Sequence, residues 1–133
     1  MKYPIVIHKD QESDYGVTVP DIPGCYTAAS SVEEAIEMAQ EAVECHLEGL
    51  LIDNDPIPLS SPIETHRRNP EFEQGVWALV EVDISKLPIK SKRVNINLPE
   101  RLLHTMNHYA KKHGESRSGL LAQAVTEYMA VHR

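Results

Sequence analysis

The chain has 133 residues, 41% hydrophobic and 25% charged, a composition that predicts one ordinary folded domain or two small ones. No apolar run approaches the ~20 residues of a membrane span, and no signal-peptide pattern follows the N-terminus, so we expect a cytoplasmic protein. The net charge of −7 is unevenly distributed along the chain. Residues 1–89 hold 5 Lys and Arg against 17 Asp and Glu, a net charge of −12, whereas residues 90–133 hold 8 against 3, a net charge of +5. The basic part suits phosphate, and the acidic part suits a basic protein partner.

The first 84 residues predict strands and one helix. Residues 3–8, 15–19 and 25–29 favour strands, and the Pro-rich stretch 20–24 favours a rigid turn. A helix is predicted over residues 31–50, with Ser31 as its N-cap and Glu34 completing a capping box. Residues 53–74 contain four prolines and predict a long loop, and residues 75–84 predict a fourth strand. The apolar stripe expected on the helix is Val32, Ile36, Ala39, Val43, Leu47 and Leu50.

The other side of this helix is strongly acidic. It carries Glu33, Glu37, Glu41, Glu44 and Glu48. Such a face is either a solvated helix surface or a docking face for a basic partner, and the sequence leaves both open.

Residues 15–25 read Tyr-Gly-Val-Thr-Val-Pro-Asp-Ile-Pro-Gly-Cys, which resembles a motif of the HicB antitoxin family, with Ile22 in the place of Leu. Residues 31–35 and 55–58 also match the family. The resemblance implies a βββαβ domain with a partial ribonuclease-H-like fold that is not an enzyme. It also implies a partner, a HicA-type toxin that cleaves messenger RNA, neutralised by occlusion of its catalytic histidine. Glu37, Glu41 and Glu44 are our candidates for contact with the toxin.

Residues 92–98 alternate strictly between apolar and polar side chains, which predicts a strand. Val94, Ile96 and Leu98 fall on one face, and Arg93, Asn95 and Asn97 fall on the other. Arg and Asn match guanine and adenine through paired hydrogen bonds, so the polar face is suited to reading base edges.

Two helices are predicted after this strand. The first begins at Pro99, carries Leu102, Leu103, Met106, Tyr109 and Ala110 on its apolar face, and ends at Gly114. The second begins after the N-cap Ser116, and its apolar face is Leu120, Leu121, Ala124, Val125, Tyr128 and Met129. One strand and two helices cannot close a core alone, so a second copy is expected to supply the pairing strand.

This order of strand, Pro, helix, Gly and Ser-capped helix resembles the ribbon-helix-helix family of DNA-binding proteins. The resemblance implies base contacts from Arg93, Asn95 and Asn97 and phosphate contacts from the start of the second helix, Ser116, Arg117 and Ser118, to which Lys92 adds charge. We therefore expect an α+β protein with three parts: a toxin-binding domain, residues 1–84; a linker, residues 85–91; and a ribbon-helix-helix (βαα) domain, residues 92–133. The expected assembly is a homodimer on double-stranded operator DNA, with a tetramer left open, and the expected function is an antitoxin that represses its own operon.

Two alternative functions compete with this one. A ribonuclease-H-type nuclease needs several carboxylates that converge on two metal ions, but Asp10, Asp14 and Asp21 lie in turns and not within strands. A ligand-responsive ribbon-helix-helix repressor without a toxin partner is the alternative function. We expect no metal and no cofactor, because the Cys and His residues lack the spacing of metal ligands. Cys25 and Cys45 are expected to be free thiols.

Overall fold

The computed structural model describes residues 1–9 and 14–132. The chain divides into two compact units, Met1–Val82 and Asp83–Arg133. Asp10, one of the carboxylates weighed above, lies outside the described residues. Within the described ranges, no helix combines the length and the apolar character that a bilayer-spanning helix requires.

The first unit is built on a four-stranded antiparallel sheet. Its strands are β1 (Lys2–Lys9), β2 (Tyr15–Thr18), β3 (Tyr26–Ala29) and β4 (Val76–Glu81), and their order in the sheet is β3-β2-β1-β4. The central strand β1 pairs with both β2 and β4, so that Val6 faces Thr18 on one side and Trp77 on the other. The predicted α+β class, with three strands, a helix and a fourth strand, is therefore confirmed for this unit.

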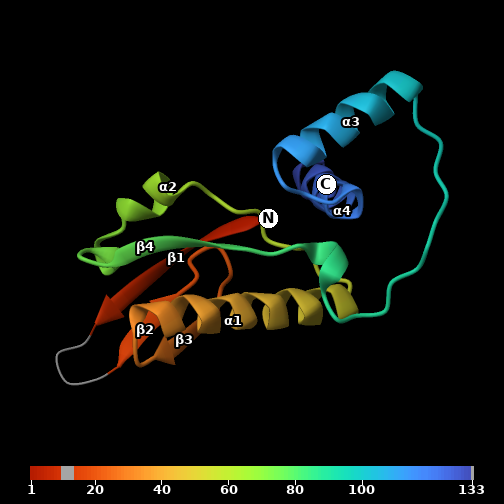
Figure 1. Ribbon diagram of the computed structural model, residues 1–133. Helices are drawn as coiled ribbons and strands as arrows, with labels where there is room; N and C mark the ends of the chain where they lie inside the picture. The colour runs from red at the N-terminus through yellow and green to blue at the C-terminus, as the bar shows by residue number, and fades with distance from the viewer. Residues whose placement is uncertain (10–13, 133) are drawn as a thin grey trace. The chain divides into compact units, whose positions relative to one another are not determined.

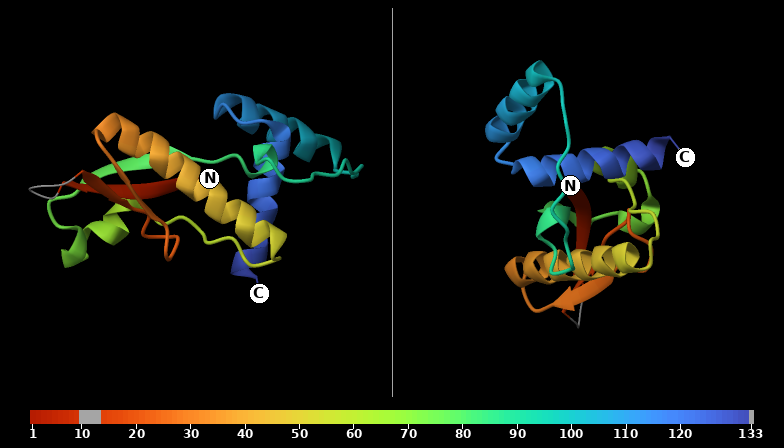
Figure 2. Two further views of the ribbon diagram at one scale, coloured as in Figure 1. Left: turned by 90° about the horizontal axis from the view of Figure 1, so that it is seen from below. Right: turned by 90° about the vertical axis from the view of Figure 1, so that its right-hand side faces the viewer.

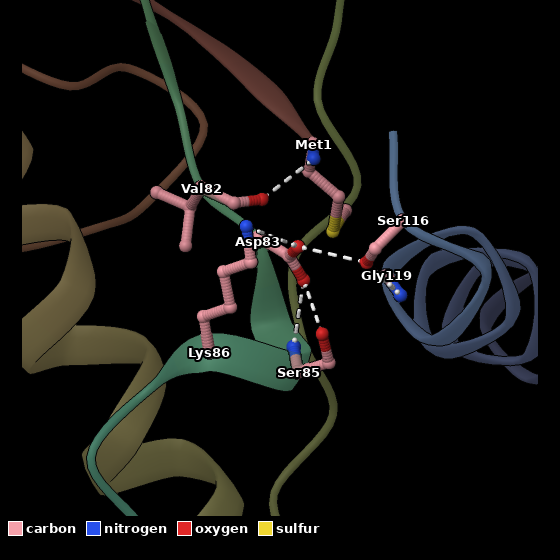
Figure 3. A network of polar contacts seen from close by, with 7 residues as sticks. All are labelled: Met1, Val82, Asp83, Ser85, Lys86, Ser116 and Gly119. Carbon is pink, nitrogen blue, oxygen red and sulfur yellow. Dashed lines mark hydrogen bonds and ion pairs between the residues drawn. The ribbon is translucent and has the colours of Figure 1, made fainter. Parts of the chain in front are cut away.

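The N-terminal residue forms hydrogen bonds with the backbone at the end of the sheet. The ammonium of Met1 donates to the carbonyl of Val82 at 2.7 Å (Figure 3). The N–H of Val82 donates to the carbonyl of Met1, also at 2.7 Å. This pair of bonds prolongs the β1–β4 ladder beyond β4. Met1 and Val82 are both buried.

The helix α1 (Val32–Ile52) packs against the sheet, and α2 (Ile63–Arg67) lies on the opposite side of it (Figure 1). The Ser31 side chain accepts a hydrogen bond from the N–H of Glu34 at 3.1 Å, which confirms the predicted N-cap. The Glu34 carboxylate bonds to Ser30 and not to Ser31, so the capping box is displaced by one residue.

The buried stripe of α1 differs from the predicted one. Its buried residues are Ala35, Ala39, Val43 and Leu47. Ile36, which we expected in the core, is exposed, and Ala35 takes its place. An alanine at the start of the helix lets the helix backbone approach the sheet closely, because its side chain is a single methyl group.

The long loop predicted over residues 53–74 contains two short helical segments that the sequence did not predict. This segment contains α2 and a 3₁₀ turn, Pro70–Phe72, and it covers the second face of the sheet. The Phe72 ring lies edge-on to Trp77 at 5.7 Å between ring centres, and His66 stacks on Trp77 at 6.3 Å. Both faces of β1 are therefore covered, which explains why five consecutive residues, Tyr3 to Ile7, are buried.

The second unit contains a 3₁₀ turn, Ile84–Lys86, followed by α3 (Glu100–Lys112) and α4 (Arg117–Val131). Figure 2 shows that α3 and α4 cross steeply at a sharp turn. Gly114 has a positive φ of 66° at this turn. The N–H of Gly114 donates to the carbonyl of Lys111, and the N–H of Glu115 donates to the carbonyl of Ala110, which is a Schellman ending. The predicted stop at Gly114 is confirmed.

Residues 90–98 have no regular secondary structure in the single chain, so the strand predicted at 92–98 does not form within it (Figure 1). The reason is physical, because a strand needs a neighbouring strand for its backbone N–H and C=O groups. The apolar faces of the helices are also incompletely covered. Val125, Tyr128 and Met129, which the sequence places on the apolar face of α4, are exposed.

Candidate functional site

The three residues predicted to read bases are exposed. Arg93, Asn95 and Asn97 are each exposed to solvent on the extended segment before α3. This segment and the two helices of the second unit enclose a groove of about 710 Å³. Its polar lining includes five of the residues predicted to contact DNA, whereas Asn97 and Ser116 are not part of it. The five are Lys92, Arg93, Asn95, Arg117 and Ser118.

The same groove has an apolar lining. Val94 and Ile96 of the extended segment line it together with Leu103, Met106 and Leu121 of the helices. Val94 is 71% exposed and Ile96 is 59% exposed, although the alternation of the sequence assigns both to an interior face. Large apolar side chains with this exposure indicate a surface that another element covers.

The second unit has little interior of its own. Among its described residues, only the apolar side chains of Leu87 and Ala110 are buried. A folded unit of this size normally buries more apolar surface. The geometry therefore supports the expectation that this unit is completed by a further chain.

The first turn of α4 carries the predicted phosphate contacts. Ser116 is the N-cap, and its hydroxyl oxygen accepts a hydrogen bond from the N–H of Gly119 at 2.9 Å. The Nε–H of Arg117 donates to Oδ1 of Asn107 at 3.0 Å, which fixes the guanidinium against α3. Sequence reasoning missed one residue here, since the Asp83 carboxylate lies against this turn (Figure 3). No local sequence pattern predicts that Asp83 contacts a helix that begins 34 residues later.

Only part of the acidic face of α1 is exposed for contact with a partner. Glu37 and Glu41 are exposed. Glu44 is half-buried, and its Oε1 accepts a hydrogen bond from the Gln40 side chain at 2.8 Å. Gln40 also donates to the carbonyl of Glu81 at 2.6 Å, so this part of the face is tied to the end of β4. Of the three candidate toxin contacts, Glu37 and Glu41 are the better placed.

The Pro-Asp-Ile-Pro-Gly-Cys motif forms a tight turn with a buried interior. The N–H of Val19 donates to the carbonyl of Cys25, and Gly24 has a positive φ of 78°. Burial raises the pKa of the Cys25 thiol, and nearby Cys45 adds to the rise, which makes Cys25 a poor nucleophile. Cys25 and Cys45 are both free thiols.

Asp21 of this motif has a structural role. Its Oδ1 lies 2.8 Å from Nε2 of His66, and its Oδ2 accepts a hydrogen bond from the N–H of Ser61 at 2.8 Å. Both carboxylate oxygens are thus used to hold the segment that carries α2. Within residues 1–9 and 14–132, no group of three or more His, Cys, Asp or Glu side chains is arranged to hold a metal ion.

Three further histidines have no metal-ligand geometry among the described residues. His104 and His108 are exposed on α3. His46 Nδ1 lies 3.2 Å from the carbonyl of Ala42 within α1.

Known proteins resemble this chain over nearly its full length. Residues 3–125 match the family described as HicB_like antitoxin of bacterial toxin-antitoxin system. The crystal structure of the Burkholderia pseudomallei antitoxin HicB is similar with a TM-score of 0.83 and 40% identity, over 96% of this chain and 98% of that one. An uncharacterized 14.9 kDa protein in the rep-hol intergenic region of Haemophilus phage HP1 is 39% identical over 128 residues, which are 95% of this chain and 96% of that protein.

A further solved structure bears on the partner. A chain of the HicA3 and HicB3 toxin-antitoxin complex is similar with a TM-score of 0.54 and 31% identity, over 62% of this chain and 99% of that one. The resemblance seen in the turn at residues 15–25 is thus confirmed over nearly the full chain. This protein belongs to the HicB-like antitoxins of bacterial toxin–antitoxin systems, a family of antitoxins and not of enzymes.

Proposed function

We propose that the first unit binds and neutralises a HicA-type, mRNA-cleaving toxin, and that the second unit binds operator DNA as a homodimer and represses the chain's own operon. The protein would act in the cytoplasm, which holds its toxin and its operator and keeps its free thiols reduced. In this proposal the first unit is a partial ribonuclease-H-like domain without catalysis, and the second unit is a ribbon-helix-helix domain.

The observation that carries the DNA-binding half is the exposure of Val94 and Ile96, in a segment with no neighbouring strand among the described residues of the second unit. Pairing of residues 92–98 with the same residues of a second copy would bury this apolar row against Leu103 and Met106. It would also satisfy the backbone groups of the segment, which no strand of its own unit does. Because side chains alternate along a strand, burying Ile96 turns Arg93 and Asn95 outward.

The two-stranded ribbon so formed has the size that the DNA major groove accepts. Arg93, Asn95 and Asn97 would contact base edges, and the first turn of α4 would hold a phosphate through its N–H groups. The net charge of +5 on residues 90–133 supports binding to a phosphate backbone. Binding should weaken steeply as salt is added, because each neutralised phosphate releases counterions.

The toxin-binding half is supported by charge and by the relative that is named as part of a toxin-antitoxin complex. Residues 1–89 carry a net charge of −12, which complements a basic, RNA-binding toxin. Glu37 and Glu41 are exposed on α1 and would take the place of RNA phosphates. Covering the toxin's active site in this way would block cleavage by occlusion alone.

The test is co-expression with the small gene adjacent to the one for this chain. We expect co-expression to relieve the growth arrest caused by the small gene and the two proteins to co-purify. Continued growth arrest without a complex would contradict the toxin-binding half. Replacing Glu37 and Glu41 by Lys should weaken the complex, with Glu71→Lys as a matched reversal of an exposed charge away from α1. Equal affinity in all variants would remove this face of α1 from the proposal.

The alternative, a ligand-responsive repressor, receives less support. The pocket beside the Pro-rich turn, lined in part by Pro20, His66 and Phe72, measures about 230 Å³. Ligand pockets usually measure about 300–1,000 Å³. This pocket is therefore small for a regulatory ligand.

A further inference from the structure

The strongest unassigned feature is the Asp83 carboxylate at the first turn of α4. A Cβ atom built on Gly119 would lie 2.7 Å and 2.8 Å from its two oxygens, closer than real Cβ atoms come to any neighbour. The Ser116 hydroxyl, which caps the helix, also donates to Oδ2 of Asp83 at 3.4 Å (Figure 3). Only glycine at position 119 leaves room for the carboxylate where it lies.

The charge pattern of the helices explains why a carboxylate lies there. The first turns of α1 and α3 carry their own acidic residues, Glu33 and Glu34 in α1 and Glu100 in α3, whereas the first turn of α4 carries none. The start of a helix has N–H groups without partners in the helix and a partial positive charge. Asp83 supplies from outside α4 the negative charge that its first turn lacks.

Asp83 is held in this place by its own segment. Its Oδ1 accepts hydrogen bonds from the N–H of Ser85 at 3.0 Å and from the hydroxyl of Ser85 at 2.6 Å. The ammonium of Lys86 lies 3.9 Å from Oδ2. The carboxylate therefore belongs to an ordered 3₁₀ turn packed on α4 and is not a side chain moving freely in solvent.

We propose that Asp83 is an internal competitor of the DNA phosphate. The start of α4 is the place where the proposed function puts a phosphate, and the Asp83 carboxylate already lies against that turn, where a second anion would meet both its charge and its volume. Asp83 must therefore leave the first turn of α4 before a phosphate binds there, so the contact is autoinhibitory and lowers the affinity for DNA. This inference rests on the proposed DNA binding.

The direct test is Asp83→Asn in the full chain. Asn keeps the shape and the capping of Ser85 but removes the charge. The probe is a duplex that spans the region upstream of the gene for this chain, titrated at several salt concentrations. Loss of the competing anion at the two helix ends of a dimer predicts about 3- to 30-fold tighter binding. A purely structural role for Asp83 predicts unchanged or weaker binding, and that result would overturn the inference.

The matched control is Glu127→Gln. It removes one negative charge from the same unit, but Glu127 lies near the other end of α4 and bonds to Gln123. We expect this control to raise the affinity by less than about 2-fold, the level of screened long-range charge effects. Equal gains in the two variants would show a general charge effect and would overturn the inference.

A second readout does not depend on DNA binding. Inorganic phosphate is titrated at constant ionic strength while the backbone amide signals of Ser118 and Gly119 are followed by NMR. We expect phosphate to shift these signals in Asp83→Asn and to shift them much less in the wild-type chain. Phosphate shifts with no binding to any duplex would refute the DNA-binding function and leave the Asp83 contact standing. Duplex binding without phosphate shifts in Asp83→Asn would refute the contact alone.

Discussion

Replacing Ile96 by Ala tests whether a second chain covers the extended segment. Ile96 is 59% exposed in the single chain, so shortening it removes little that stabilises the isolated chain. In the proposed dimer the side chain is buried, and its loss should weaken association. The substitution is therefore expected to separate two properties, lowering dimer stability and leaving the fold of each unit intact.

The expected size follows from the exposed fraction. Complete burial of an Ile side chain contributes about 1.5–3 kcal/mol, so burying the exposed part of Ile96 contributes about 1–2 kcal/mol. Each dimer contains two copies, and the loss is about 2–4 kcal/mol. At about 1.4 kcal/mol for each factor of ten, the dissociation constant of the dimer should rise roughly 30- to 1,000-fold.

The assay is sedimentation equilibrium over a range of concentrations, and the control is Ile52→Ala. Ile52 is 71% exposed at the end of α1, in the first unit, so the same chemical change is made at a similarly exposed position. We expect the control to dimerise like the wild-type chain. Equal dissociation constants for Ile96→Ala and Ile52→Ala would refute the reasoning, because Ile96 would then lie outside any dimer contact.

Three single substitutions test other contacts within the two units. Asn95→Ala should weaken binding to the operator by about 1–3 kcal/mol and leave binding to random duplex unchanged, as measured by fluorescence anisotropy; equal losses on both would contradict base reading. His66→Ala should lower the free energy of unfolding in urea by about 1–3 kcal/mol, because Asp21, whose side chain is only 6% exposed, would lose a partner; an unchanged midpoint would contradict this role. The third concerns Glu34, whose pKa is lowered by the side-chain and backbone hydrogen bonds from Ser30. Because the folded pKa lies below the unfolded pKa, Glu34 stabilises the fold above the unfolded pKa, and this contribution is lost as the pH falls through the folded pKa. Glu34→Gln should therefore be less stable than wild type at neutral pH, with the difference shrinking in acid; a difference independent of pH would contradict it.

Local signals in the sequence predicted the elements well where local chemistry decides them. Ser31 and Ser116 cap helices, and Gly114 ends one, because each acts on backbone groups within a few residues. The strands of the first unit were predicted by composition and periodicity. Their bounds differ by only a few residues, as in the fourth strand, expected at 75–84 and observed at Val76–Glu81.

Contacts between residues far apart in the chain could not be predicted in the same way. The segment that carries α2 is held by Asp21 and His66, which are 45 residues apart, and a local pattern rich in proline and polar residues resembles a loop. Asp83 and Gly119 meet for the same kind of reason. Choosing Ala35 over Ile36 for the core also depends on how closely α1 approaches the sheet, which periodicity does not specify.

The central claim is that two chains pair through residues 92–98, and an isotope-filtered NOE experiment tests it most directly. A sample mixed from labelled and unlabelled full-length chains reports only contacts between different chains. We expect NOEs from the Val94 and Ile96 methyl groups of one chain to apolar side chains of the other chain, both in its segment 92–98 and in its helices. Interchain NOEs that arise from other surfaces, with none from these methyl groups, would contradict the claim.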